Sequence, residues 1–423
     1  MLLCFHAVAA SANDNWNSSF GMPGASDAVG ASAYVGANFF VTGTFRNIGG
    51  INASCVARYD GTNWHSLGEG LNGEFTVPQT LAYLHDSLYV GGVFRQAGTS
   101  AVNNIARWDG TNWWPCGSGV AGIVRQMAVF QGNLIVGGSF SSAGGVPAAN
   151  IARWDGTNWS ALGTGVTWPY SGPAVDSLAA SASELYVGGR FRTAGGVAAM
   201  NVAKWNGSSW SALGNGLRYN DGPDWAGNGI VRAMVMSQGR LFAGGEFSKA
   251  GDTTVANISA WDGTNWTAIG ADLGTFWVLT VNGSDVFAGG FFNGPNHVAK
   301  WTGSSWVALG SGAGGGPDGG AVWGLAANGS ELFVGGRFEM AGSQPANNIA
   351  LWHIPHALSA SYAGETATLS WPATGTNFLL EAKESIADTN WTVVATHPAV
   401  IGDQCRVTNP INSSARFFRL RRK

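Results

Sequence analysis

The chain has 423 residues and a formal net charge of −3, and only 11% of its residues are charged. Hydrophobic residues make up 45% of it, and it contains 64 Gly and 20 Trp. This much apolar material excludes an intrinsically disordered chain, and the weak net charge excludes a general attraction to nucleic acid. No apolar run approaches the ~18 residues of a transmembrane helix, so we expect no transmembrane segment. The composition predicts an all-β protein.

Residues 1–12 include an apolar stretch that ends in Ala10-Ser11-Ala12, which is similar to the cleavage site of a secretory signal. The basic segment that normally precedes such a stretch is missing, and the stretch is short. We interpret these residues as the remainder of a signal peptide, the alternative being a disordered N-terminus. The first interpretation predicts a secreted or cell-surface protein.

Residues 13–354 contain one sequence pattern seven times. In each copy an apolar run ends in a Gly, usually the second of a Gly-Gly pair, and a Phe follows two residues later. The seven anchor glycines are Gly43, Gly92, Gly138, Gly189, Gly245, Gly290 and Gly336, at intervals of 45 to 56 residues. We expect the Gly-Gly pairs to allow close packing between neighbouring sheets, and the Phe residues and paired Trp residues to fill the space between them.

Each copy is predicted to form four short strands, as the third copy illustrates. Its strands are 125–130, 134–138, 151–154 and a last one beginning at Trp159. Gly-Asn and Asp-Gly turns separate the first and last strand pairs, and such turns between apolar runs indicate hairpins. Four strands in 40–50 residues is the period of a propeller blade. The sequence therefore predicts a seven-bladed β-propeller.

The two ends of the repeat region complement each other. The seventh copy stops after Trp352 without a fourth strand, whereas residues 14–18 resemble residues 157–161, where the fourth strand of the third copy begins. We therefore predict that an N-terminal strand containing Trp16 completes the last blade and closes the ring, which removes an exposed sheet edge.

The pattern Tyr-Val-Gly-Gly, followed by Ala-Arg-Trp-Asp-Gly-Thr-Asn-Trp and Leu-Gly, resembles kelch-type β-propellers. Its residue pattern is more similar to those of fungal bud-site landmark propellers and of the delta-sixty-type repeats of secreted bacterial proteins. The resemblance recurs in all seven copies and implies the propeller fold, but it does not imply one function, because propellers serve many. The catalytic residues of copper-radical oxidases that share the kelch repeat have no matching constellation in this sequence.

Residues 355–423 follow a different pattern, with about five short strands separated by turns. They predict a small β-sandwich and resemble the fibronectin-like modules that end many secreted bacterial repeat proteins. The cluster Arg416, Arg419, Arg421, Arg422 and Lys423 either attaches this module to an acidic surface or anionic envelope polymer, or is a solvated chain end.

The loops that join one blade to the next vary in length, whereas the turns within each outer hairpin do not. Loops on a rigid scaffold are where binding residues concentrate. The candidate ligand-binding aromatics on these loops are Trp168, Tyr170, Tyr219 and Trp225. They either stack on a ligand or fold back against the blades. Asp221 and Asp224 are too few oxygen ligands to predict a Ca²⁺ site.

A second candidate site lies at the mouth of the central channel. Positions 13 residues before each anchor are equivalent, and they are Gly30, Gln79, Arg125, Asp176, Arg232, Trp277 and Trp323. We predict that these residues ring the opening on the face that carries the long loops. Arg125, Asp176 and Arg232 beside the two tryptophans make a polar socket for a carboxylate or a sugar; alternatively, the charged groups merely pair with one another.

These features predict a non-catalytic, secreted or cell-surface recognition or adhesion protein that binds a glycan or protein ligand through its loop face. The alternatives are an architectural spacer without a specific ligand and a propeller enzyme acting on carbohydrate. Glycoside hydrolysis needs two carboxylates ~5–10 Å apart, and the predicted ring contains only Asp176. The seven His residues lie at non-equivalent positions, so we expect no metal and no cofactor.

Overall fold

The structure is a computed structural model, and every regular element in its described part is a β-strand. The described residues are 15–17, 20–169, 172–219, 229–270, 272–293, 297–315, 319–355, 358–363, 366–372, 378–383, 390–401, 404–410 and 417–422. Two compact units are present. The larger contains Trp16–Ala327 and Phe333–Leu351; the smaller contains the residues from Trp352 onward, with Asn15 and the turn Asn328–Leu332.

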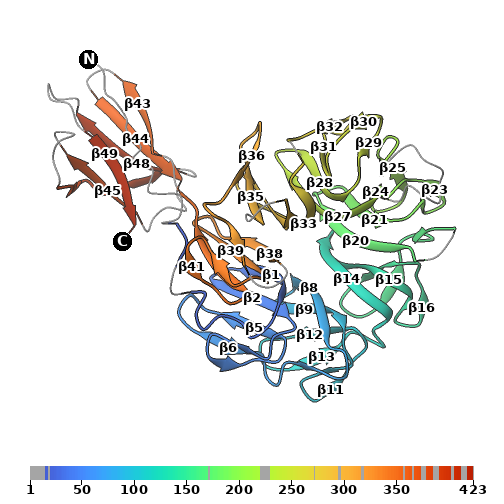
Figure 1. The fold of residues 1–423 in the computed structure, drawn as a ribbon. Helices are drawn as coiled ribbons and strands as arrows, with labels where there is room; N and C mark the ends of the chain where they lie inside the picture. The colour runs from blue at the N-terminus through green and yellow to red at the C-terminus, as the bar shows by residue number, and fades with distance from the viewer. Residues whose placement is uncertain are drawn as a thin grey trace. The chain divides into compact units, whose positions relative to one another are not determined.

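The larger unit is a ring of β-sheets around a central channel (Figure 1). Each sheet contributes one inner strand to the channel wall, and we number the blades by these strands. The inner strands are β1 (Val29–Val35), β8 (Val77–Leu84), β14 (Val120–Phe130), β20 (Ala174–Ala180), β27 (Ile230–Ser237), β33 (Gly274–Asn282) and β38 (Ala321–Ala327). Each inner strand packs beside the next, and β38 packs beside β1, so the ring is closed. This arrangement is consistent with the predicted seven blades.

The remaining strands of each blade follow outward in antiparallel order. The second strands are β2 (Asn38–Gly43), β9 (Ser87–Val93), β15 (Asn133–Ala143), β21 (Leu185–Arg190), β28 (Arg240–Glu246), β34 (Asp285–Phe292) and β39 (Glu331–Arg337). The third strands are β5 (Val56–Tyr59), β12 (Ile105–Trp108), β17 (Ile151–Trp154), β24 (Val202–Trp205), β31 (Ile258–Trp261), β35 (Val298–Trp301) and β42 (Ile349–His353). The fourth strands are β6 (Trp64–Ser66), β13 (Trp113–Pro115), β18 (Trp159–Ala161), β25 (Trp210–Ala212), β32 (Trp266–Ala268) and β36 (Trp306–Ala308).

Blade 7 receives its outermost segment from the N-terminal part of the chain. The Asn17 N–H donates to the Leu351 carbonyl at 2.9 Å, and the His353 N–H donates to the Asn15 carbonyl at 2.8 Å. Trp16 is buried and lies against Gly342, as Trp159 lies against Gly144 in blade 3. The predicted closure of the ring by an N-terminal strand is confirmed.

The Gly-Gly pairs let the blades approach one another closely. A Cβ on Gly137 would lie 2.4 Å from Val175 Cγ1 on the next blade, and a Cβ on Gly335 would lie 2.8 Å from Val29 Cγ1 across the closure. Real Cβ atoms do not approach other atoms so closely, so a side chain at these positions would push the blades apart. The predicted packing role of the glycines is confirmed.

Fourth-strand tryptophans also join neighbouring blades. The Trp159 Nε1–H donates to the Cys116 carbonyl of the preceding blade at 2.9 Å, and the same bond recurs from Trp113, Trp210, Trp266 and Trp306. The Trp159 ring lies 5.2 Å from that of Trp154 on the adjacent strand. Each such indole therefore fills the space between sheets and satisfies its one donor in doing so.

A buried Asn joins each of several blades to the loop that enters the next. In blade 3 the Asn150 side-chain oxygen accepts a hydrogen bond from the Phe140 N–H at 3.1 Å, and its amide donates to the Val166 carbonyl at 2.9 Å. Its φ is +67°, a left-handed conformation that Asn tolerates better than most residues. Asn104 and Asn201 make the same two bonds. In blade 6, His297 takes this position.

Short accessory strands add small sheets to the connections. They are β3 (Asn47–Ile48), β4 (Ile51–Asn52), β7 (Leu71–Asn72), β10 (Gln96–Ala97), β11 (Ser100–Ala101), β16 (Val146–Pro147), β19 (Val166–Thr167), β22 (Thr193–Ala194), β23 (Val197–Ala198), β26 (Leu217–Arg218), β29 (Lys249–Ala250), β30 (Thr253–Thr254), β37 (Ala313–Gly314), β40 (Met340–Ala341) and β41 (Gln344–Pro345). They lie on the connections between second and third strands and on those between blades. Blade 6 is the exception in sequence, with five residues between Phe292 and Val298 where the other blades have ten.

The smaller unit contains a two-sheet β-sandwich. One sheet has the order β43 (Ser359–Ala363), β44 (Thr366–Pro372), β48 (Gln404–Pro410) and β47 (Ala399–Ile401), and the other β46 (Thr392–Val393), β45 (Phe378–Lys383) and β49 (Phe417–Arg422). Leu369, Trp371 and Val407 of the first sheet share a core with Leu380 of the second. The predicted small C-terminal sandwich is confirmed.

Two of the clustered C-terminal arginines are engaged within this sandwich. Arg419 Nε donates to the Glu381 carboxylate at 2.9 Å, and Arg421 Nε donates to it at 2.6 Å. The Arg419 guanidinium also lies 4.4 Å from the ring centre of Trp391. Burial by itself would raise the pKa of Glu381, but the bonds from Arg421 and Arg419 outweigh it, so the pKa is lowered. These two arginines belong to a packed ion-pair cluster rather than to a solvated chain end; Arg416 and Lys423 lie outside the described residues.

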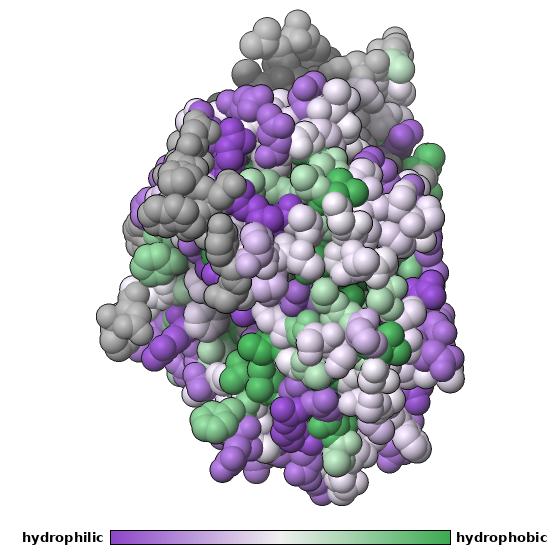
Figure 2. All heavy atoms as spheres, turned by 90° about the vertical axis from the view of Figure 1, so that its right-hand side faces the viewer, coloured by the Kyte–Doolittle hydropathy of each residue, from purple (hydrophilic) through white to green (hydrophobic). Residues whose placement is uncertain are grey.

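Figure 2 shows the side of the molecule that lies at the right of Figure 1. On this face hydrophilic and hydrophobic residues are interspersed among weakly polar ones, and no continuous hydrophobic band crosses it. Within the described ranges no helix has the length and hydropathy needed to cross a membrane.

Candidate binding site at the mouth of the central channel

A β-bulge places one residue of each of six inner strands at the channel mouth. The strand register shifts at Gly30, Gln79, Arg125, Asp176, Arg232 and Trp277, and Trp323 has the corresponding position in β38. Bulges re-aim a side chain out of the regular alternation. All seven residues line one cavity of about 610 Å³. The structure therefore brings together the seven positions that the repeat spacing made equivalent.

The anchor glycines stand opposite these bulges. A Cβ on Gly138 would lie 1.9 Å from the Ile123 carbonyl oxygen, and one on Gly245 would lie 2.0 Å from the Ile230 carbonyl oxygen. The backbone at each bulge thus occupies the space that a side chain would need. The repeated Gly is what allows a bulge, and hence an inward-pointing side chain, in blade after blade.

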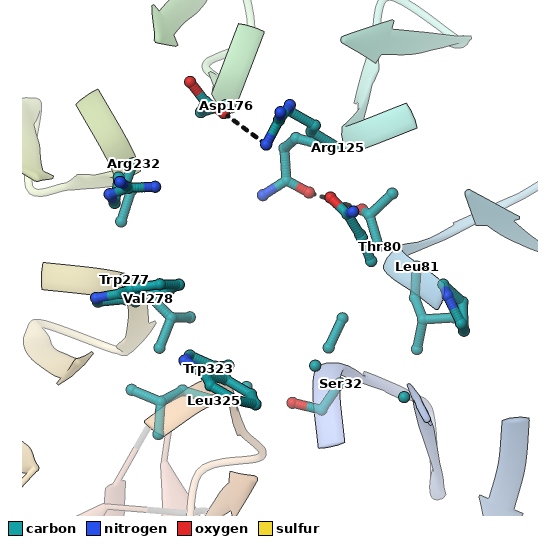
Figure 3. A pocket seen from close by; sticks show the side chains of 18 of the residues that line it. Ser32, Thr80, Leu81, Arg125, Asp176, Arg232, Trp277, Val278, Trp323 and Leu325 are labelled. Atoms are coloured by element: carbon teal, nitrogen blue, oxygen red, sulfur yellow. Dashed lines mark hydrogen bonds and ion pairs between the residues drawn. The ribbon is translucent and has the colours of Figure 1, made fainter. Parts of the chain in front are cut away.

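Charged groups occupy one side of the channel mouth (Figure 3). Arg125 Nη1 lies 3.4 Å from Asp176 Oδ1, and Arg232 Nε donates to Glu246 Oε1 at 2.7 Å. Burial raises the pKa of the Asp176 carboxyl above its usual value, while the positive charges of Arg125, Arg232 and Arg190 oppose that rise. Among the described residues, this side includes Arg125, Arg190 and Arg232 together with Asp176 and Glu246.

Two indole rings form the adjoining wall. The ring centres of Trp277 and Trp323 lie 6.1 Å apart with an angle of 40° between the rings. The Arg232 guanidinium lies 4.9 Å from the Trp277 ring centre, an orientation in which the cation attracts the π face. Trp277 is 40% exposed, so a large part of its ring stays accessible to a ligand.

Deeper in the channel the wall is mostly apolar. Two residues inward from the mouth positions of five blades are Leu81, Met127, Met234, Leu279 and Leu325, all of which line the cavity, whereas the equivalent Leu178 of blade 4 is not part of the lining. Ser32 is the polar member of this layer. The strand alternation in the sequence was sufficient to predict this deeper layer, but we predicted only the residues at the channel mouth. Glu246 and Arg190 were also missed, because they come from second strands.

Three polar atoms on the channel wall are buried and have no hydrogen-bond partner among the described residues: Ser32 Oγ, Arg125 Nε and Trp323 Nε1. Two of them are N–H groups, which can only donate. An unsatisfied buried polar group costs free energy of about 1–3 kcal/mol. All three atoms are shielded from solvent in this structure, so a ligand at the mouth contacts the partly exposed groups instead, such as the Arg125 side chain, which is 34% exposed.

The predicted loop aromatics have different outcomes. Trp168 is buried, with the Arg192 guanidinium 5.0 Å from its ring centre, so of the two predicted alternatives this side chain folds back against blade 4 in the structure. Tyr219 is 53% exposed, but it does not line the channel. Tyr170 and Trp225 lie outside the described residues, as do Asp221 and Asp224.

A second cavity, of about 710 Å³, adjoins the channel mouth and shares Trp277 and Trp323 with it. We call it the blade-6 groove. Its lining also includes Phe291, which is 51% exposed, and the charged residues Asp27, Arg337 and Glu339. The groove lies beside the shortened connection of blade 6. Among the described residues no group of three or more His, Cys, Asp or Glu side chains is placed to hold a metal ion.

The comparisons with known proteins concern the fold. The family "Domain of unknown function (DUF5122) beta-propeller" matches residues 132–155, which include the second and third strands of blade 3. No curated protein matches the chain. The structure of "YCF48 bound to D1 peptide" is similar over 85% of this chain and 100% of its own, with 13% identity and a TM-score of 0.48.

Two other solved structures are similar to this chain to a comparable extent. The WD40 β-propeller domain of Doa1 is similar over 78% of this chain and 93% of its own, with 12% identity and a TM-score of 0.46. An acylaminoacyl peptidase from Pyrococcus horikoshii is similar over 86% of this chain and 59% of its own, with 9% identity and a TM-score of 0.42. Likenesses of this size carry no argument about ligand or activity. By its sheets and the matched repeat, the chain is an all-β protein built on a β-propeller.

Proposed function

We propose that the protein is a non-catalytic recognition protein that binds a glycan or protein ligand at the loop face of its propeller. The observation that supports this best is the channel mouth, where bulged residues from different blades surround one cavity. Arginine, carboxylate and indole groups converge there. A cavity with an apolar wall and a few convergent polar groups is the usual form of a ligand site.

A carbohydrate-cleaving enzyme is less well supported by the same residues. Acid–base cleavage of a glycosidic bond needs a pair of carboxylates flanking the bond. Asp176 is the one residue with a carboxylate among those described that line the channel. The nearby Glu246 is bound to Arg232. A spacer without a ligand would not explain why polar groups converge at the channel mouth.

We also propose that the protein is secreted or lies at the cell surface. The support is the apolar stretch before Ala10-Ser11-Ala12 and the low content of charged residues. The C-terminal sandwich is the part we propose for attachment to an anionic envelope polymer. Because Arg419 and Arg421 already pair with Glu381, we expect this attachment to be weak.

Binding of the full-length protein to a glycan array and to a peptide library tests the proposal. Arg125→Gln and Trp277→Ala should each weaken whatever binding is found, because one loses a charged donor and the other the exposed indole. Trp114→Ala is the matched control, since Trp114 is 46% exposed and lies on the outer strand β13. Equal loss in all three variants, or no binding to either collection, would refute a specific site at the channel mouth.

A further inference from the structure

The blade-6 groove belongs to the one blade whose repeat carries a deletion. In the other blades the ten residues between the second-strand Phe and the third strand contain short accessory strands, as at β10 and β11. Blade 6 has only five residues there. The lining of the groove includes Phe291, which ends β34 just before this connection, together with Trp277 and Trp323.

The Phe291 ring, which lines the groove, packs on a buried side chain. His297 is buried, and its ring is stacked on Phe291 with ring centres 5.7 Å apart and planes 19° apart. The Phe292 N–H donates to His297 Nδ1 at 3.1 Å, so Nδ1 is an acceptor and Nε2 carries the proton, which it donates to the Gly319 carbonyl at 2.9 Å. The half-exposed Phe291 ring is thus packed on one face against a hydrogen-bonded imidazole.

The two cavities differ in charge. At the channel mouth the partly exposed side chains of Arg125 and Arg232 line the cavity, and guanidinium groups suit an anionic acceptor such as a carboxylate. The groove instead contains two carboxylates, Asp27 and Glu339, beside Arg337. A ligand that is acidic along its whole length would be repelled by these carboxylates. A ligand with one acidic end and neutral units behind it would not be.

We propose that the channel mouth and the blade-6 groove are one extended site for an oligosaccharide that ends in a uronic acid and continues in neutral sugars. The terminal carboxylate accepts hydrogen bonds at Arg125, and the apolar face of that pyranose ring lies on Trp277. The next sugar units follow the groove over Phe291. This inference rests on the proposed function and specifies its ligand.

A pyranose ring fits this combination because it has an apolar C–H face and a rim of oxygen acceptors. Flat rings that are already ordered lose little entropy on stacking against an ordered indole. A peptide carboxylate would satisfy Arg125 equally well, but its backbone would leave donors and acceptors unpaired against the apolar wall of Trp277 and Phe291. The geometry therefore favours a carbohydrate.

The experiment measures binding of the full-length protein by isothermal titration calorimetry. The probes are glucuronic acid, xylotriose carrying one glucuronic acid residue, the methyl ester of that oligosaccharide, and unsubstituted xylotetraose. We expect the acidic oligosaccharide to bind most tightly. Its methyl ester, which keeps the ring but loses the charge, should bind about ten-fold or more weakly, because charge-assisted hydrogen bonds are lost.

Variants separate the two halves of the site. Phe291→Ala should weaken the acidic oligosaccharide about ten-fold while leaving glucuronic acid unchanged, since only the longer ligand reaches the groove. Arg125→Gln should weaken both. Phe75→Ala is the matched control, because Phe75 is 83% exposed and lines neither cavity.

The outcomes distinguish the inference from the proposed function. Equal affinity for the acid, its ester and xylotetraose would overturn the inference, as would a loss with Phe75→Ala as large as that with Phe291→Ala. Binding of peptides or of neutral glycans alone, sensitive to Trp277→Ala, would overturn the inference and leave the proposed function standing. Absence of binding to all the probes and to the wider collections would overturn both.

Discussion

Replacing Asn150 tests how the blades are joined. Asn150 is buried, accepts a hydrogen bond from the Phe140 N–H and donates one to the Val166 carbonyl of the segment entering blade 4. It also has a φ of +67°. Asn150→Ala removes both bonds and places a residue with a Cβ in the left-handed region. Asn150→Gly removes both bonds but tolerates the conformation.

The magnitudes follow from these two differences. Each buried backbone group left unpaired costs about 1–3 kcal/mol, so the loss of both bonds lowers the free energy of unfolding by about 2–6 kcal/mol in either variant. The left-handed conformation adds about 1–2 kcal/mol for Ala and almost nothing for Gly. We therefore expect the order wild type, then Asn150→Gly, then Asn150→Ala, with the larger step between the first two.

Urea unfolding of the full-length protein, followed by tryptophan fluorescence, measures the order. Hydrogen exchange at the Phe140 amide reports the local effect, and its protection should fall in both variants. If Asn150→Gly is as stable as the wild type and only Asn150→Ala is destabilised, the Asn serves its backbone conformation alone. The hydrogen-bond reasoning would then be refuted.

Three further changes have definite expected results. Trp16→Ala should lower the free energy of unfolding by about 3–5 kcal/mol, as for other buried aromatics. Trp114→Ala, at an exposed Trp, should change it little. Equal melting temperatures for the two variants would contradict closure of the ring by residue 16. A uronate bound beside Asp176 should raise the pKa of that carboxyl further, so binding should take up a proton and weaken as the pH rises through that pKa. Titration calorimetry in buffers of different ionisation enthalpy measures the proton uptake, which Asp176→Asn should abolish. Binding by the wild type that does not depend on pH would contradict the placement of the ligand carboxylate. Because the pKa of Glu381 is lowered in the folded protein, its contribution to stability is present above about pH 4.3, the pKa in the unfolded chain, and is lost as the pH falls through the lower pKa of the folded protein. Glu381→Gln should flatten this acid dependence. An identical acid unfolding curve for both proteins would show that the pairs with the arginines add nothing to stability.

The repeat and its consequences were predictable from sequence because they depend on local patterns. Turn residues and strand alternation recur in phase with the anchor glycines, so positions such as Arg125, Asp176 and Trp277 are equivalent wherever the copies are aligned. Strand order within a blade follows from short hairpins, and the unmatched strand at residue 16 follows from counting. Each of these features needs only neighbours in the chain or the symmetry of identical units.

Features that depend on contacts between distant residues were not predictable in this way. Trp168 looked like a loop aromatic available to a ligand, but its side chain is buried in the folded protein. The unpaired donors of Arg125 and Trp323 emerge only when the other groups around the channel are in place. Likewise, the shortened connection of blade 6 is visible in the sequence, but the groove that shares Trp277 and Trp323 with the channel mouth is not.

The sequence by itself thus determined the number of repeats, the closure of the ring and the set of residues at the channel mouth. The tertiary structure alone decided which of those residues are paired, which aromatics stay exposed and where the loop face is open. The physical reason is that a repeat fixes equivalence through local backbone geometry, whereas pairing and exposure depend on side chains brought together from different blades.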